Sequence, residues 1–538
     1  MLKRFICAFL VLILAATCFY VAYTADDAGF AASRSEDEGI SSGDIAGQGV
    51  TEDDGSLTLW YSDDALTEYL TSVALSFQQD QGIKVNIILK DGVQFLEAIN
   101  AVSVKPATER DEPMPDLYIT SHDNLLRAYL AGLASPITDP AGVVTDAMYP
   151  QTALDAVSCY DHYVGYPLYY ETNFLLYNKT YMASIAQNKI EADADLAEGM
   201  EATQELLDNG APKEESEEVK PEDSNGEDEG SRPEDGDDAE TSDDEMSDPM
   251  GEEDAVADPE VLEKLATMIP ASIEDIKTFA NNYDAPEAVE SVFKWDVSDI
   301  FYNYFFVGNY MDVGGPHGDN AAIFNIYNSQ AVESLREYQE MNQFFSIDTK
   351  VDSYDKILQD FIDGKMVFTV ATTDAIKRIH EAQKAGDFEF EYGVSTLPDI
   401  SSLLKARGLS VTDAVAINGY SDKKPDANRF ATYLVNYKAQ DLYAKSGKVS
   451  CSKAVEYEDA EISKTMDEYE RSVPLPKMVE AANYWVQLEI AFTKVWNGAD
   501  PDETLKELSD TIGAQIEEIR ANLPTQESFN AGAGTFVF

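Results

Sequence analysis

Segments with strand-like and helix-like patterns alternate over residues 57–131, and this alternation constrains the fold more than any other feature of the chain. The strand-like runs are Leu57–Tyr61, Ile83–Leu89 and Asp116–Thr120. The runs with apolar residues at helical spacing are Leu66–Phe77, Val93–Val102 and Asn124–Ala131. Regular alternation of this kind predicts an α/β fold, in which a parallel or mixed sheet is covered by helices on both faces.

Acidic loops follow two of these predicted strands. Ser62-Asp-Asp comes directly after the first strand, and Ser121-His-Asp comes after the third. In open α/β sheets, ligands bind beyond the carboxyl ends of the strands, where loops can present polar groups without disturbing the core. We therefore expect these two loops to lie at a binding site.

The N-terminal residues predict export from the cytoplasm. Two basic residues precede the uncharged run Phe5–Tyr23, and a polar acidic stretch follows, which is typical of an export signal over residues 1–24. The apolar run is also long enough to span a bilayer as an uncleaved anchor. Cys18 follows Ala15-Ala-Thr, which resembles a lipoprotein cleavage site. Lipidation at Cys18, cleavage elsewhere and retention of the apolar helix all stay open, and each outcome leaves the protein secreted or tethered to a membrane.

The chain is strongly acidic, and the charge is unevenly spread. Its formal net charge is −62, and 23 of the residues from Lys213 to Glu260 are Asp or Glu. Residues 212–259 have no aromatic side chain and cannot bury enough apolar surface to offset the entropy of ordering, so we expect a disordered acidic insert there. Residues 25–55 form a second acidic linker. Because a nucleic-acid binder needs clustered Lys and Arg, the charge argues against nucleic acid as a partner.

Cysteine and histidine patterns give no sign of catalysis or of a metal site. Beyond the export segment only Cys159 and Cys451 remain, and two buried free thiols are preferred slightly over a disulfide between them. The four histidines are scattered along the chain, and no motif for a nucleophilic serine, a phosphate-binding loop or a zinc protease is present. We therefore expect no enzymatic activity.

Several separate motifs together resemble one protein family. In chain order they are Trp60–Asp64, Gln81–Val85, Pro115–Asp123, Gly165–Lys179, Phe361–Val370, Tyr392–Pro398, Leu475–Met478, Tyr484–Trp485 and Val495–Leu505. Their order and spacing are similar to those of family 1 extracellular solute-binding proteins, the maltose-binding type that serves ABC importers of sugars. The resemblance extends from Ser56 to about Leu523, interrupted by the acidic insert.

The resemblance implies a two-lobed periplasmic-binding-protein-like fold with discontinuous lobes and a hinge between them. The N-terminal lobe would hold residues 56–169 with about 413–450, and the C-terminal lobe residues 172–405 with about 455–523. The implied protein is a monomer that needs no cofactor. It captures a small saccharide outside the cytoplasm by closing its lobes and delivers it to the transmembrane subunits of an ABC transporter.

The same resemblance implies ligand contacts at seven positions, which are Asp64, Asp123, Tyr170, Glu171, Trp295, Asp374 and Trp485. Carboxylates accept hydrogen bonds from paired hydroxyls, and an indole face packs on the apolar face of a pyranose. Three of them have an alternative role, since Asp64 and Asp123 are also suited to cap helices and Trp485 to fill a core.

The sequence departs from the maltose-binding pattern where two stacking tryptophans are expected. Thr120 and Asp374 stand at those places. The remaining acids leave a second ligand class open, namely a cation such as a polyamine or an amino sugar held by carboxylates and an aromatic wall. A surface adhesion protein that keeps the fold without transport is a third interpretation, suggested by the acidic insert.

Overall fold

One mixed sheet organises the chain in the computed structural model, which describes residues 55–208, 256–481 and 483–522. Its main strands run in the order β2-β1-β3-β12-β6-β10-β7. Their bounds are β1 Leu57–Tyr61, β2 Val85–Leu89, β3 Leu117–Ser121, β6 Tyr166–Asn178, β7 Ser291–Lys294, β10 Met366–Thr372 and β12 Leu409–Ile417. Three short strands complete it, with β11 Tyr392–Ser395 and β13 Val449–Ser450 on β6 and β14 Val473–Pro474 on β12.

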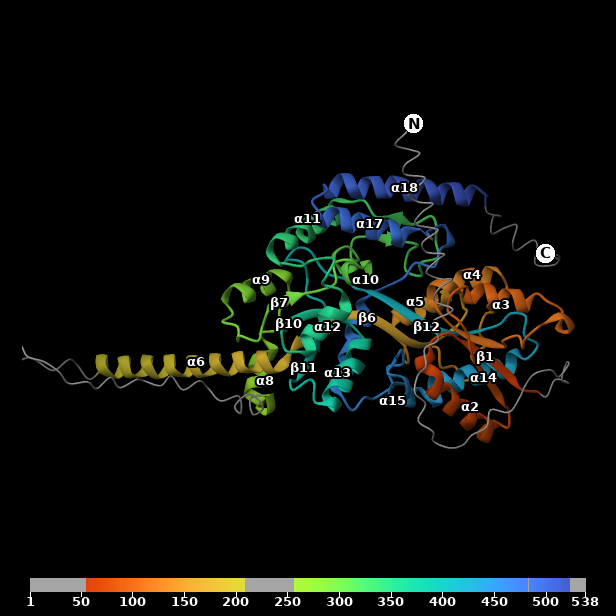
Figure 1. Ribbon diagram of the computed structural model, residues 1–538, viewed down its shortest axis with the longest axis horizontal. Helices are drawn as coiled ribbons and strands as arrows, with labels where there is room; N and C mark the ends of the chain where they lie inside the picture. The colour runs from red at the N-terminus through yellow and green to blue at the C-terminus, as the bar shows by residue number, and fades with distance from the viewer. Residues whose placement is uncertain (1–54, 209–255, 482, 523–538) are drawn as a thin grey trace, which may run out of the picture. The chain divides into compact units, whose positions relative to one another are not determined.

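The sheet is mixed, because it contains both parallel and antiparallel strand pairs. β1 pairs in parallel with β2 and β3, whereas β12 runs antiparallel to both β3 and β6. β6, at 13 residues, pairs with β12 through its first part and with β10 through its last part. It therefore joins the two halves of the sheet, as Figure 1 shows.

Helices cover both faces of the first half, as the sequence predicts. Alternate residues of β1 point to opposite faces. Leu57, Leu59 and Tyr61 pack in one buried cluster with α2, while Trp60 packs in another with α3. The helices of this half are α2 Thr67–Gln81, α3 Phe95–Ser103, α4 Leu125–Leu130, α5 Gln151–Val157, α14 Lys424–Thr432 and α15 Leu442–Ser446.

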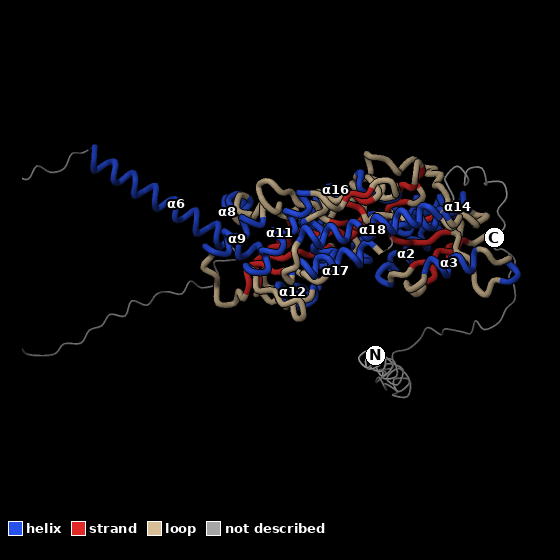
Figure 2. The backbone as a smooth tube through the Cα atoms, turned by 90° about the horizontal axis from the view of Figure 1, so that it is seen from above, coloured by secondary structure: helices blue, strands red, loops and turns tan. Residues whose placement is uncertain are grey.

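The second half carries the larger helical layer, visible from above in Figure 2. Its helices are α6 Lys179–Asp208, α8 Pro259–Ala266, α9 Ile273–Asn282, α10 Ile300–Asn303, α11 Ser329–Phe344, α12 Tyr354–Ile362, α13 Asp374–Ala385, α16 Ala460–Arg471, α17 Tyr484–Trp496 and α18 Pro501–Asn522. The aromatic run 301–306 forms α10 and the following 3-10 turn Tyr304–Phe306. All but Phe301 of its aromatic rings are buried.

The helix α6 is longer than the fold around it requires. Its residues 191–201 are exposed, and Figure 1 shows it extending beyond α8 and α9. The predicted acidic insert, 212–259, lies outside the described residues except for its last four. There the predicted boundary is too late, because Asp258 accepts a hydrogen bond from Glu260 N at 2.8 Å and Pro259 begins α8.

The N-terminal predictions also lie outside the described residues, including the export segment 1–24, Cys18 and the linker 25–55 apart from Gly55. Within the described part of the chain, no helix combines the length and apolar character needed to cross a bilayer. Cys159 and Cys451 are both buried free thiols, as the sequence analysis preferred.

Candidate ligand-binding site

A lysine joins the acidic loop at the carboxyl end of β1 to a carboxylate of the strand β6. Lys448 Nζ lies 2.8 Å from Asp63 Oδ2 and 3.1 Å from Glu171 Oε1. The same nitrogen lies 5.1 Å from the centroid of the Tyr169 ring. Residues far apart in the sequence therefore meet here, and we call these four the Lys448 group.

Asp63, rather than the predicted Asp64, belongs to this group. The Asp63 side chain accepts a hydrogen bond from Ala65 N at 3.0 Å and so caps the 3-10 turn Asp64–Leu66. Capping holds the second oxygen of Asp63 toward Lys448. Asp64 is exposed in the first turn, so the capping role considered for it belongs to its neighbour.

The strand β6 places Tyr169 and Glu171 on one face and Tyr170 on the other, because successive side chains alternate. Tyr170 is 1% exposed, and its ring stacks on Tyr469 with the centroids 3.9 Å apart. Its hydroxyl lies 2.7 Å from Thr465 Oγ1. Tyr170 thus packs β6 against α16, away from the Lys448 group.

Two further carboxylates lie where β3, β12 and β6 run side by side. Asp413 of β12 is opposite Ser121 on β3 and opposite Tyr169 on β6, and the register on β6 shifts directly after it. Such irregularities bend a strand and re-aim its side chains. Asp123 accepts a hydrogen bond from Ser121 Oγ and does not cap the short helix in which it lies.

Burial, followed by the charge of Glu171, raises the pKa of Asp413 to about 8. Lys448 opposes this shift but does not cancel it. Asp413 therefore carries a proton at neutral pH and can donate a hydrogen bond as well as accept one. The site accordingly contains a carboxyl group that can donate a hydrogen bond.

A second polar group lies in the other half of the sheet, after β10. Tyr354 OH donates to Asp374 Oδ1 at 2.8 Å, and the rings of Tyr302 and Tyr354 stack with centroids 4.7 Å apart. Asp374 is exposed at the first position of α13. The neighbouring Thr373 Oγ1 lies 3.4 Å from the carbonyl oxygen of Tyr170, so this strand end adjoins β6 close to Glu171.

The two predicted tryptophans occupy different environments. Trp295 is 0% exposed, stacks on Phe293 with centroids 5.0 Å apart and donates from Nε1 to Asn303 Oδ1 at 2.9 Å. It is therefore a core residue in this conformation. Trp485 is partly exposed in the first turn of α17, with its ring centroid 5.4 Å from that of Tyr304.

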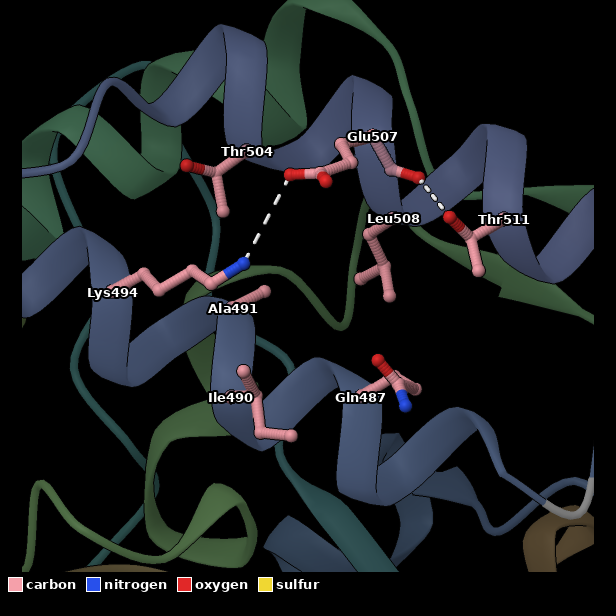
Figure 3. A pocket seen from close by; sticks show the side chains of 8 residues that line it. All are labelled: Gln487, Ile490, Ala491, Lys494, Thr504, Glu507, Leu508 and Thr511. Atoms are coloured by element: carbon pink, nitrogen blue, oxygen red, sulfur yellow. Dashed lines mark hydrogen bonds and ion pairs between the residues drawn. The ribbon is translucent and has the colours of Figure 1, made fainter. Parts of the chain in front are cut away.

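Two surface cavities lie apart from these groups. The first, shown in Figure 3, has a volume of about 70 Å³ between α17 and α18, where Lys494 Nζ is 3.9 Å from Glu507 Oε2. Ligand pockets usually measure about 300–1,000 Å³, so this one is too small for a sugar. The second, about 510 Å³, lies beside the last turn of α2 and includes Gln81 and Tyr433. That turn leads into the start of β2, at the opposite end of the strands from Asp63.

Among the described residues, no group of His, Cys, Asp and Glu side chains is arranged to hold a metal ion. Tyr169, Asp413 and Lys448 were not predicted from the sequence, and Asp63 was predicted only as part of the loop Ser62-Asp-Asp. For Tyr169 the signal was present, because residues two apart on a strand share a face and Glu171 was already selected. For Lys448 no local signal exists, since its carboxylate partner Glu171 is 277 positions away.

Residues 73–467, more than half of the chain, match the family model described as bacterial extracellular solute-binding protein. The chain belongs to this family. Its members are solute-binding components of ABC importers and act outside the cytoplasm, so this extracellular solute-binding protein is extracytoplasmic and of importer type.

Solved structures of other solute-binding proteins have the same fold. A Staphylococcus aureus extracellular solute-binding protein in complex with maltose aligns with a TM-score of 0.61 at 18% identity, covering 87% of this chain and 100% of that one. A cyclo/maltodextrin-binding protein with maltotetraose gives 0.60 at 16% identity, with 90% and 100% covered. The maltose-binding periplasmic protein of Listeria monocytogenes gives 0.58 at 17% identity, with 88% and 100% covered. The predicted two-lobed α/β fold is thereby confirmed.

Proposed function

We propose that this solute-binding protein captures a small carbohydrate between its lobes and delivers it to the membrane subunits of an ABC importer. The observation that carries the proposal is the convergence of Asp63, Glu171 and Asp413 beside the ring of Tyr169. Carboxylates accept hydrogen bonds from vicinal hydroxyls, while the ring of Tyr169, which is 4% exposed, is part of the core beside them. The structural relatives named above hold maltose or a maltodextrin, which supports this ligand class.

The proposed lobes meet across β6 and β12. One lobe comprises residues 56–169 with about 413–450, and the other residues 172–405 with about 455–523. The Lys448 group lies on the first lobe and at the crossing, while Tyr302, Tyr354 and Asp374 belong to the second. Asp123 and Trp485 remain proposed contacts on the two sides. Closure is driven only by contacts that a ligand makes in the closed form.

The proposal extends to the location and state of the protein. It acts as a monomer without a cofactor or catalytic step, tethered outside the cytoplasm through lipidated Cys18 or through its apolar N-terminal segment. The membrane subunits of the importer are its protein partner.

A thermal-shift screen tests the ligand class. Residues 55–538 form a compact unit by themselves and are the material for the screen. The ligands are mono- and oligosaccharides, polyamines and amino sugars, each at low and moderate salt. A ligand that binds only the native state stabilises it by about 2.7 kcal/mol at a hundredfold excess over Kd. The proposal predicts a shift with one saccharide class that salt leaves unchanged. A shift with polyamines alone would refute it.

A further inference from the structure

Lys448 makes the contacts that a cationic ligand would otherwise make. Its ammonium lies between Asp63 and Glu171 and 5.1 Å from the ring centroid of Tyr169. Two carboxylates and an aromatic face are the groups that bind a primary ammonium through ion pairs and cation–π attraction. The two carboxylates are part-exposed, with side-chain exposures of 30% and 40%, while that of Lys448 is only 21%.

We propose that Lys448 is the specificity-determining residue of the site, because its ammonium excludes cationic ligands and leaves the site to neutral polyols. This inference rests on the proposed function, since it concerns which ligands the same site accepts. The sequence left neutral saccharides and cations open as ligand classes, and by this proposal the Lys448 side chain selects the neutral class.

The physical basis is competition with a tethered cation. Lys448 is part of the chain, so its local concentration at Asp63 and Glu171 is in the millimolar range or above. A ligand ammonium that displaced it would leave a second positive charge close by, and the two would repel. Burial lowers the pKa of Lys448, but the carboxylates of Glu171 and Asp63 raise it further, to a net value above the ordinary one. Lys448 therefore stays charged at any physiological pH.

The same contacts leave groups for a neutral ligand. Lys448 binds Oδ2 of Asp63 and Oε1 of Glu171, one oxygen of each carboxylate. Glu171 can still accept a hydrogen bond through Oε2, and protonated Asp413 can donate one. Hydroxyl groups both donate and accept, so a polyol matches this combination, whereas an ammonium group only donates.

The test is a comparison of Lys448→Met with two matched controls. Lys448→Arg keeps the charge in place. Lys445→Met removes the same charge three positions earlier, where Lys445 Nζ lies 3.9 Å from Glu68 Oε1. Binding of spermidine and of glucosamine is measured by titration calorimetry at two salt concentrations, and thermal unfolding confirms that each variant is folded. We expect Lys448→Met to bind spermidine at least tenfold more tightly than the parent and more weakly at higher salt, with both controls unchanged.

Two results would overturn the inference. One is a parent protein that binds spermidine with Lys448 in place, and the other is a folded Lys448→Met protein that gains no affinity for it. The saccharide screen is run on the same proteins, so the two proposals can fail separately. If the parent binds no saccharide but Lys448→Met gains affinity for spermidine, only the carbohydrate function is refuted. If the parent binds a saccharide but Lys448→Met gains no affinity for spermidine, only the role of Lys448 is refuted.

Discussion

His122 Nδ1 accepts a hydrogen bond from the backbone N–H of Thr412 at 3.0 Å. The other ring nitrogen, Nε2, therefore carries the proton and donates to the carbonyl oxygen of Leu475 at 3.1 Å. One fully buried ring thus links the end of β3, the strand β12 and the segment that leads into α17. The contact with Thr412 requires a neutral imidazole, because a protonated Nδ1 cannot accept a hydrogen bond.

Because His122 is neutral in the native state, we expect the stability of the fold to fall in acid. Burial and, next, the charge of Lys477 lower the pKa of His122 from 6.5 to about 4. Between pH 4 and pH 6.5 the native state consequently binds fewer protons than the unfolded state. The contribution of neutral His122 to the free energy of unfolding is therefore complete above pH 6.5 and is lost as the pH falls toward 4. The loss is about 3 kcal/mol. Denaturant unfolding across pH 4–7.5 measures this loss. In His122→Gln the free energy of unfolding should depend less steeply on pH, by up to one proton taken up on unfolding. Parallel profiles for the two proteins would contradict this prediction.

The neighbours Asp63 and Asp64 should differ in their effect on ligand binding. Asp63→Asn removes a carboxylate of the Lys448 group, and loss of one charged hydrogen bond of about 1.5–3 kcal/mol weakens binding roughly 10- to 100-fold. Asp64→Asn, at an exposed position, should change the affinity less than about twofold. Calorimetry with the saccharide found in the screen decides between them. The opposite order would restore Asp64 as the contact residue.

Adjacent tyrosines on β6 provide a second matched pair. Tyr169→Leu should weaken saccharide binding about tenfold, since it removes the ring that the Lys448 ammonium contacts and so disturbs the Lys448 group. Tyr170→Phe should leave the affinity unchanged but lower the stability by about 1 kcal/mol, because it removes the hydrogen bond to Thr465. Binding and denaturant unfolding are measured on both. A binding defect in Tyr170→Phe would place that residue on the ligand side after all.

The buried Lys477 should stabilise the junction between the lobes. Its Nζ donates to the carbonyl oxygens of Asp155 and Ala156 in the last turn of α5, at 2.6 and 3.0 Å. Lys477→Met keeps the apolar stem but leaves these acceptors unpaired, which we expect to cost about 2 kcal/mol in denaturant unfolding. The exposed Lys453→Met is the control and should stay within about 0.5 kcal/mol of the parent. Equal stability of the two variants would show that Lys477 contributes nothing.

The acidic insert should be dispensable for binding. Asp193 of α6 pairs with Lys264 of α8 at 2.9 Å, and α6 continues for about 22 Å beyond it. A flexible linker of about twelve residues can span that distance and replace residues 209–255. We expect the saccharide affinity of this variant to stay within about twofold of the parent value. A large loss of affinity would assign the insert a part in ligand capture.

Local signals were sufficient for the fold and insufficient for the site. The strand Leu57–Tyr61 is formed as predicted, since its burial and its flanking polar residues are both local properties. The helix predicted from Leu66 begins one residue later, because Asp63 caps a 3-10 turn first. The site depends on which oxygen atoms converge after folding. A shift of one position exchanges Asp64 for Asp63, and the partner Lys448 lies in the short connection between α15 and β13, far away in the sequence.

The position of β12 has a consequence for the order of folding. Residues 409–417 insert between β3, which ends at Ser121, and β6, which begins at Tyr166. The first half of the sheet therefore cannot close on a growing chain until more than four hundred residues have been synthesised, and such long-range pairing forms slowly. A chain whose central strand arrives late keeps the neighbouring edges of β3 and β6 unpaired until most of its synthesis is complete.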